Sequence, residues 1–125
     1  MVALSKILIK EWEHREGPAI FTTVNDDGVP NSIYVSCVRL FDNETLVVAD
    51  NHFHKTRTNI FSGCNVSLLF RTKDWDTYQI KGDVEYHTEG EIFEDMKGWN
   101  PPHRAGHGAA VVRIDKVPSG SKQLI

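Results

Sequence analysis

Long hydrophobic runs are missing from this sequence. No apolar stretch approaches the roughly 18 residues that a membrane-spanning helix needs. The N-terminal segment 1–17, MVALSKILIKEWEHREG, carries lysines and glutamates where a signal peptide has an unbroken apolar core. The sequence therefore predicts a cytoplasmic protein without a membrane partner.

Cysteine and blocks of like charge are also scarce. The two cysteines, Cys37 and Cys64, lack C-x-x-C spacing, and each lies in an apolar, strand-like run. We expect two reduced, buried thiols rather than a redox pair or a disulfide. The formal net charge is -3 without a basic block, which argues against nucleic-acid partners because these need an extended basic surface. Any bound anion should be small.

Length and composition predict one folded domain, residues 1–125. Apolar residues make up 40% of the chain and charged residues 25%, close to the averages of soluble globular proteins. A chain of 125 residues can bury one core but hardly two. The composition excludes a disordered or a fibrous chain.

The spacing of hydrophobic residues changes along the chain. An amphipathic helix with Ser5 as its N-cap is predicted near the N-terminus by the helical spacing of Leu4, Ile7, Leu8 and Trp12. Segments 54–63 and 89–98 predict two further short helices. Runs rich in β-branched and aromatic residues predict six strands, at 18–26, 31–41, 45–50, 64–72, 77–88 and 109–117.

Residues 77–88 alternate most regularly between apolar and polar side chains. One face of this strand should therefore meet the core, with Tyr78, Ile80, Val84 and Tyr86. The other face should meet solvent or a ligand, with Gln79, Lys81, Asp83, Glu85 and His87. Gly82 falls on the apolar face, where we expect a bulge or the close approach of another group.

Six mostly sequential strands with few helices predict a mainly β protein. An antiparallel barrel is the favoured architecture, because closing the sheet removes the exposed edges that an open sheet carries. The short helices would then flank the barrel.

The segment NHFHKTRTN, residues 51–59, concentrates cationic and hydroxyl side chains in an acidic protein. The helix predicted there would have Thr56 or Thr58 as its N-cap and end at Gly63. Helix N-termini favour anions, and Lys55 and Thr56 would add an ammonium and a hydroxyl, which suggests a phosphate site. The alternative is a solvated cationic turn in which Thr56 only caps the helix. Spacing alone leaves both interpretations open.

The run 30–60, PNSIYVSCVRLFDNETLVVADNHFHKTRTNI, resembles the pyridoxamine 5'-phosphate oxidase-like, FMN-binding split-barrel family. Its small FMN-binding proteins of sulfate-reducing bacteria are the most similar members. The resemblance lies in a strand that opens with Asn-Ser, a second apolar strand, and His-Lys-Thr at the start of a helix. The segment YQIKGDVEYHT also fits the family. The resemblance implies a six-stranded antiparallel split β-barrel that dimerises and holds FMN at the subunit interface.

The resemblance also implies roles for particular residues. Lys55 and Thr56 match the phosphate ligands of the family, and Asn59 follows in the same helical turn. Asn31 and Ser32 match positions that meet the flavin ring and the ribityl chain.

Three further groups are implied by the same resemblance. Val48, Ala49 and Asp50 match the strand end over which the flavin lies. Lys81 and Gly82 are placed near the phosphate by analogy. Trp99 is a candidate for the aromatic residue that family members place against the flavin of the partner subunit.

The histidines allow more than one interpretation. His103 and His107 share a loop with Arg104, and this loop could bind a substrate or simply be solvated; we favour it as the variable wall of the ligand pocket. His52 and His54 could join these histidines in a metal site if the two loops met. Scattered surface histidines are more common, so no metal is predicted.

Two functions of different class remain open. In the first, the protein is an FMN-dependent oxidoreductase or electron-transfer protein, related to flavin reductases or to pyridoxamine 5'-phosphate oxidase. In the second, it is a non-catalytic module that carries FMN, the deazaflavin F420 or haem. The sequence identifies no catalytic residue, electron donor or electron acceptor.

Overall fold

The computed structural model describes residues 3–116 and contains one sheet with three helices. The end of the last predicted strand, Val117, lies outside the described residues. The elements are α1 Lys6–Glu13, β1 Ala19–Val24, β2 Pro30–Val35, β3 Val38–Asp42, β4 Thr45–Ala49, α2 Lys55–Phe61, β5 Asn65–Arg71, β6 Thr77–His87, α3 Glu91–Trp99 and β7 Ala109–Lys116.

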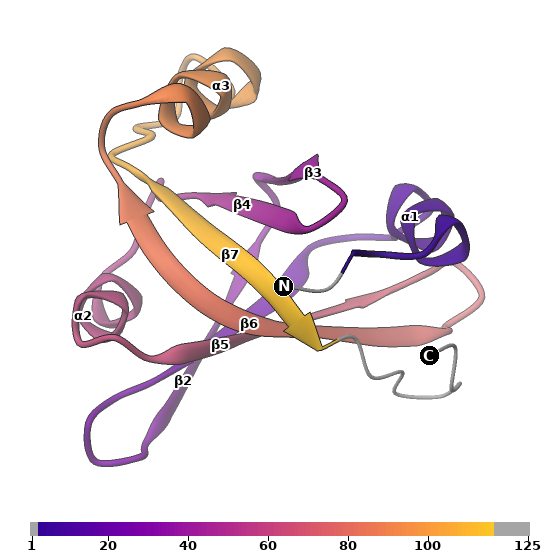
Figure 1. Ribbon diagram of the computed structural model, residues 1–125, viewed down its shortest axis with the longest axis horizontal. Coiled ribbons are helices and arrows are strands. Elements are labelled where there is room, and N and C mark those ends of the chain that lie inside the picture. The colour runs from indigo at the N-terminus through magenta and orange to yellow at the C-terminus, as the bar shows by residue number, and fades with distance from the viewer. Residues whose placement is uncertain (1–2, 117–125) are drawn as a thin grey trace.

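The sheet is a split antiparallel barrel, as predicted (Figure 1). Its strand order is β2-β1-β5-β6-β7-β4-β3, and every pairing is antiparallel. The first and last strands in this order are consecutive in the chain, separated only by Ser36 and Cys37. The sheet therefore curls until its two edges meet without pairing.

The barrel has seven strands rather than six because the predicted strand 31–41 is two strands. The N–H of Val38 donates to the carbonyl of Ser36 at 3.1 Å, which closes a three-residue turn around Cys37. β2 then pairs only with β1, and β3 only with β4. Val35 and Val38 are buried on either side of this turn, so the apolar pattern continues through the break.

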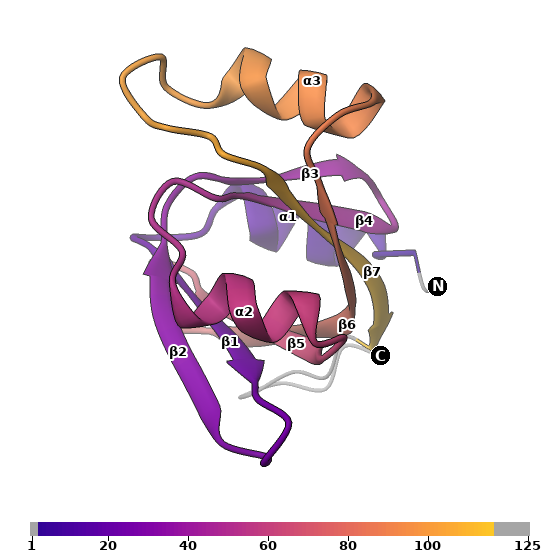
Figure 2. The same ribbon diagram turned by 90° about the vertical axis from the view of Figure 1, so that its left-hand side faces the viewer.

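β4 is buried on both faces, and α3 packs on one of them. Leu46 and Val48 belong to the core inside the barrel, whereas Val47 and Ala49 belong to a second apolar cluster beneath α3. Figure 2 shows α3 at one end of the barrel and α2 beside β1 and β2 at the other. The two helices thus approach the barrel from different sides.

Ser5 caps α1 as predicted, accepting a hydrogen bond from the N–H of Leu8 at 3.2 Å. Leu8 and Trp12 are buried against the barrel, and the Trp12 ring meets Phe70 edge-on at 5.1 Å. Ile7 is an exception to the predicted face, because it is 60% exposed.

The alternation and the bulge predicted in β6 are both confirmed. Tyr78 and Ile80 are buried, whereas Lys81 and Asp83 are exposed. The register with β7 shifts between Lys81 and Gly82. A Cβ on Gly82 would stand 2.1 Å from the Arg113 carbonyl oxygen, so only glycine allows this approach.

Both cysteines are free, but the prediction that they are buried in strands is wrong. Cys37 lies in the turn between β2 and β3, and Cys64 lies just before β5, each partly exposed. Within residues 3–116, no helix is long and apolar enough to cross a membrane.

Candidate functional site

The helix α2 begins at Lys55, directly after His54, which makes no side-chain capping bond. Thr56 and Thr58, the predicted caps, lie inside the helix instead, so that prediction is wrong. Gly63 does end the segment, with φ +81° and its N–H donating to the Ile60 carbonyl at 3.0 Å. The first turn of α2 contains no acidic residue.

Two amide side chains join α2 to β1 and β2. Asn31 Nδ2 donates to Thr56 Oγ1 at 3.1 Å, and Asn59 Nδ2 donates to Thr23 Oγ1 at 3.0 Å. Thr56 is only 1% exposed, so in this conformation its hydroxyl is bonded within the protein, to Asn31. The first turn is therefore held rigidly against β2.

Lys55 is exposed, whereas the next residue, Thr56, is buried. None of the ion pairs found in residues 3–116 involves its ammonium group. Ser32, the residue after Asn31 on β2, shares a hydrogen bond with Thr22 on β1, with 2.8 Å between the hydroxyl oxygens. The predicted residues Asn31, Lys55 and Thr56 thus form a polar row with one free cation, whereas the side chain of Ser32 points to the other face of β2.

Asp50, which follows β4, is fully buried and anchors three segments. Its Oδ2 accepts hydrogen bonds from Arg57 Nε at 2.6 Å and from the Tyr86 hydroxyl at 2.5 Å. Its Oδ1 accepts from the N–H of Phe53 at 2.9 Å. These bonds tie β4, α2 and β6 together at Asp50.

The electrostatics of this cluster follow from burial and hydrogen bonding. Burial opposes ionisation of Asp50, but the hydrogen bonds from Arg57, Tyr86 and Phe53 outweigh it and hold the pKa of Asp50 below its usual value. Burial, together with the bond to Asp50, raises the pKa of Tyr86 to about 12. At neutral pH the cluster is a carboxylate bound by a guanidinium and a neutral phenol.

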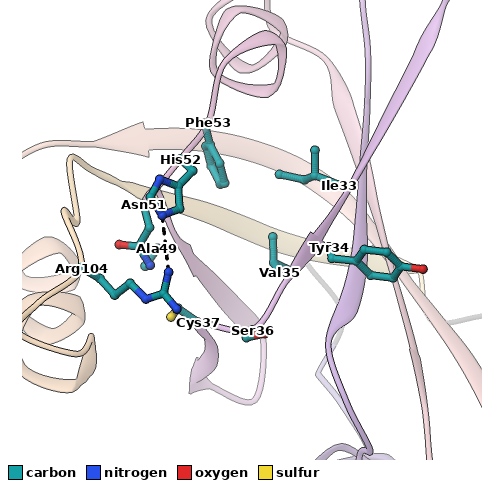
Figure 3. A pocket seen from close by; sticks show the side chains of 10 residues that line it. All are labelled: Ile33, Tyr34, Val35, Ser36, Cys37, Ala49, Asn51, His52, Phe53 and Arg104. Carbon is teal, nitrogen blue, oxygen red and sulfur yellow. Dashed lines mark hydrogen bonds between the residues drawn. The ribbon is translucent and has the colours of Figure 1, made fainter.

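A cleft of about 350 Å³ opens where β2 ends and the chain turns into β3 (Figure 3). Figure 3 shows the Tyr34 ring extending away from the other labelled side chains, on the opposite side of β2 from Ile33 and Val35. Residues from β2, from the end of β4 and from the 99–108 loop line this cleft: Ile33, Tyr34, Val35, Ser36, Cys37, Ala49, Asn51, His52, Phe53 and Arg104.

The loop wall of the cleft is fixed by a pair of buried amides. Asn51 and Asn100 exchange two hydrogen bonds, at 3.1 Å and 2.9 Å. Asn51 Oδ1 also accepts from the N–H of Gly106 at 2.9 Å. The Lys97 ammonium donates to the carbonyls of Ala105 and Gly106, at 3.2 Å and 3.3 Å. This part of the loop is therefore anchored at both ends.

The structure separates the remaining predicted residues. Val48 is fully buried in the barrel, and only Ala49 of its strand end lines the cleft. Lys81 and Gly82 line a separate cavity of about 280 Å³ with residues of β1 and β5. Trp99, the last residue of α3, is partly buried, with the Arg39 guanidinium 5.5 Å from its ring centroid. In one chain these three groups do not meet the polar row.

Several residues of the site were missed by sequence reasoning. Arg57 was visible in the cationic cluster, but no sequence spacing indicates its pairing with Asp50. The sequence pattern assigns Tyr86 only to the core face, and it predicts no role for Asn51 or Phe53. The 99–108 loop was predicted as a wall of the ligand pocket; of the three residues weighed there, Arg104 lines the cleft.

The fold and the cleft define a small split-barrel protein with a ligand-sized opening beside a cationic helix turn. Residues 6–118 match the family model described as pyridoxamine 5'-phosphate oxidase. The chain therefore belongs to the pyridoxamine 5'-phosphate oxidase family. It is also 30% identical to an uncharacterised protein of Methanocaldococcus jannaschii over 122 residues, which cover 94% of this chain and 80% of that protein.

Solved structures share the fold at lower identity. HupZ of Group A Streptococcus superposes with a TM-score of 0.83 and 21% identity, covering 96% of each chain. An FMN-binding protein from Syntrophomonas wolfei superposes with a TM-score of 0.74 and 16% identity, covering 93% of this chain and 92% of that one. At these identities the likeness establishes the split-barrel fold alone.

Proposed function

We propose that this protein binds FMN at the interface of a homodimer and acts as an oxidoreductase or electron-transfer protein. Family membership supports a flavin ligand, as does the fold shared with the FMN-binding protein of Syntrophomonas wolfei. Lys55 would hold the phosphate, with Thr56 and Asn59 fixing the helix turn. Asn31 and Ser32 would meet the ribityl chain.

The observation that carries the proposal is the exposed Lys55 at the end of the polar row. Its ammonium group has no acidic partner in the described part of the chain, and α2 has no acid in its first turn. A lone cation beside side-chain amides and hydroxyls suits a phosphate better than a cation or an apolar group. The phosphate is what distinguishes FMN from riboflavin.

The cleft suits the ring of the flavin. Its volume of about 350 Å³ lies at the lower end of the range for small-molecule sites. Ile33, Val35, Ala49 and Phe53 offer apolar surface to a flat face, and Asn51 lies nearby with its amide. Both walls are close in sequence to the polar row, because Ile33 lies two residues after Asn31 on the same face of β2 and Phe53 precedes Lys55 by two residues.

A second subunit would complete the site. The cleft is open on one side, and two aromatic rings, those of Tyr34 at the cleft and of Phe61 at the end of α2, are 75% and 66% exposed. Apolar rings left in water are typical of surfaces that another chain covers. Trp99 of the partner is the proposed aromatic neighbour of the ring. Sedimentation should give a dimer, and a monomer that still binds FMN tightly would contradict this part of the proposal.

Bound FMN supplies a ring that accepts and donates hydride or single electrons. The residues of this chain supply position: they bind the phosphate, hold the ring between apolar walls and shield one face from water. One experiment distinguishes an oxidoreductase from a non-catalytic carrier. It measures the reduction of the bound flavin by NAD(P)H in the presence of an added acceptor. Steady turnover supports the oxidoreductase, and a flavin that stays oxidised supports the carrier.

The absorption spectrum of the purified protein tests the ligand directly. We expect flavin bands and, after release, a cofactor with the mass of FMN. A colourless protein that takes up no added FMN would overturn the assignment. Release of F420 or haem would keep the fold and replace the ligand.

A further inference from the structure

One cation faces the cleft without a carboxylate to neutralise it. Arg104 is exposed and lines the cleft, and none of the other lining residues is acidic. None of the ion pairs found in residues 3–116 involves Arg104. The cleft therefore has a positive electrostatic character at the 99–108 loop, away from Lys55.

The loop that carries Arg104 is held in place before any ligand arrives. The N–H of Arg104 donates to the Pro101 carbonyl at 2.9 Å, which closes a turn. Asn100 and Gly106, on either side of this turn, are both bound by the buried Asn51. A guanidinium on an anchored turn loses less entropy when it binds than one on a free loop.

Arg104 donates to a weak hydrogen-bond acceptor, the ring of His52. Its Nη1 lies 3.4 Å from Nε2 of His52 (Figure 3), and because arginine only donates, this nitrogen must be the acceptor. A carboxylate or phosphate oxygen accepts more strongly than an imidazole nitrogen. An anion entering the cleft would therefore displace His52 from the guanidinium.

We infer that Arg104, with His52 beside it, recognises an acidic group on the substrate, so that the substrate is a small organic acid with an apolar body. The inference rests on the proposed function, because it assigns to the substrate the part of the cleft at the loop. With the flavin ring against Ile33, Val35 and Phe53, the body of the substrate would lie between that ring and the loop. Arg104 would donate to its carboxylate or phosphate in the two-pronged geometry of a guanidinium.

Benzoate and benzamide are a matched pair of probes, since they share a shape and differ in charge. Calorimetric titration of the FMN-loaded protein should show benzoate binding about tenfold more tightly than benzamide. Arg104→Gln should abolish this preference, and Arg104→Lys should retain part of it because the charge remains. Arg71→Gln removes the same charge from the β5–β6 hairpin and should leave the preference unchanged. Equal affinities in the wild type, or equal effects of R104Q and R71Q, would overturn the inference.

A second comparison separates the substrate from the phosphate of FMN. If Arg104 held that phosphate, R104Q would weaken FMN and spare riboflavin, and the inference would be wrong. We expect R104Q to leave both flavin affinities within about twofold of wild type. Should the protein bind no flavin, the proposed function fails by itself. Benzoate and benzamide titrated into the flavin-free protein would then still test Arg104.

Discussion

Two cations stand two residues apart on α2 and meet opposite surroundings. Arg57 donates to the buried Asp50 at 2.6 Å, and this hydrogen bond raises the pKa of Arg57 above its usual value. Lys55 is exposed, and no acidic side chain in residues 3–116 pairs with it. One charge stabilises the fold, and the other is available to a ligand.

This difference shows that the cationic cluster at 51–59 has two functions. The composition of this cluster does not show which of its cations is paired within the protein. Arg57 is the cation that pairs with the buried carboxylate of Asp50, because a charge without water around it must be paired. Mutations of the two halves should therefore separate stability from ligand binding.

The largest effect is expected from Asp50→Asn. The change leaves Arg57 without its charge partner and weakens the bonds from Tyr86 and Phe53. We expect the free energy of unfolding to fall by about 3 kcal/mol, measured by urea denaturation. Asp83→Asn is the control, because Asp83 is an exposed carboxylate on β6. Similar values for the two variants would show that the buried cluster contributes little.

Acid should remove the same contribution. The folded-state pKa of Asp50 is lowered, so its stabilising effect is complete above the unfolded pKa of about 4 and is lost as the pH falls further. The stability difference between wild type and Asp50→Asn should therefore shrink below about pH 4. A difference that stays constant down to pH 2 would contradict the lowered pKa, provided that both proteins still unfold reversibly.

Tyr86→Phe should have a smaller effect, because it removes one hydrogen bond and keeps the ring. The ring packs over Gly108 and meets Phe61 edge-on at 5.1 Å. We expect a loss of about 2 kcal/mol at neutral pH, against less than about 0.5 kcal/mol for Tyr34→Phe on the exposed face of β2.

The contribution of the Tyr86 hydroxyl should also disappear in alkali. Its folded-state pKa is raised to about 12. The stabilisation is thus complete below the unfolded pKa of about 10 and is lost as the pH rises from there towards the folded value. Urea denaturation of wild type and Tyr86→Phe between pH 8 and 12 would detect this convergence, and a difference that grows with pH would refute it.

The sequence predicts most of the helices and strands, because many of their features depend on residues that are close together in the chain. The alternation in β6, the Ser5 cap and the close approach at Gly82 each depend on a residue type at a defined spacing. The same is true of the end of α2 at Gly63. The same residue types at the same spacing give the same local structure in other proteins.

The remainder depends on contacts between distant parts of the chain. The turn at Ser36 and Cys37 is hidden because apolar residues flank it on both sides. The partners of Asp50 come from α2 and β6, and those of Asn51 come from the loop after α3. Patterns between neighbouring residues therefore cannot predict these hydrogen bonds. The candidate site follows the same division: Lys55 and Asn31 were visible in the sequence, whereas Phe53 and Asn51 were not.

Thr56→Ala distinguishes a ligand contact from a structural one. Thr56 is buried and accepts from Asn31 at 3.1 Å. If its hydroxyl only holds Asn31 in place, the variant should lose about 1 kcal/mol of stability and bind FMN and riboflavin with equally reduced affinity. A loss confined to FMN would instead indicate that the hydroxyl turns towards the phosphate.

The most direct test of the proposed phosphate site is Lys55→Ala, titrated with FMN and with riboflavin. Its stability should stay within about 0.5 kcal/mol of wild type, because the side chain is exposed and unpaired. Its affinity for FMN should fall about tenfold, while its affinity for riboflavin stays unchanged, since only FMN carries the phosphate. Lys73→Ala, an exposed lysine in the β5–β6 hairpin, should affect neither ligand. An equal loss for FMN and riboflavin, or no loss for either, would contradict a phosphate site at Lys55.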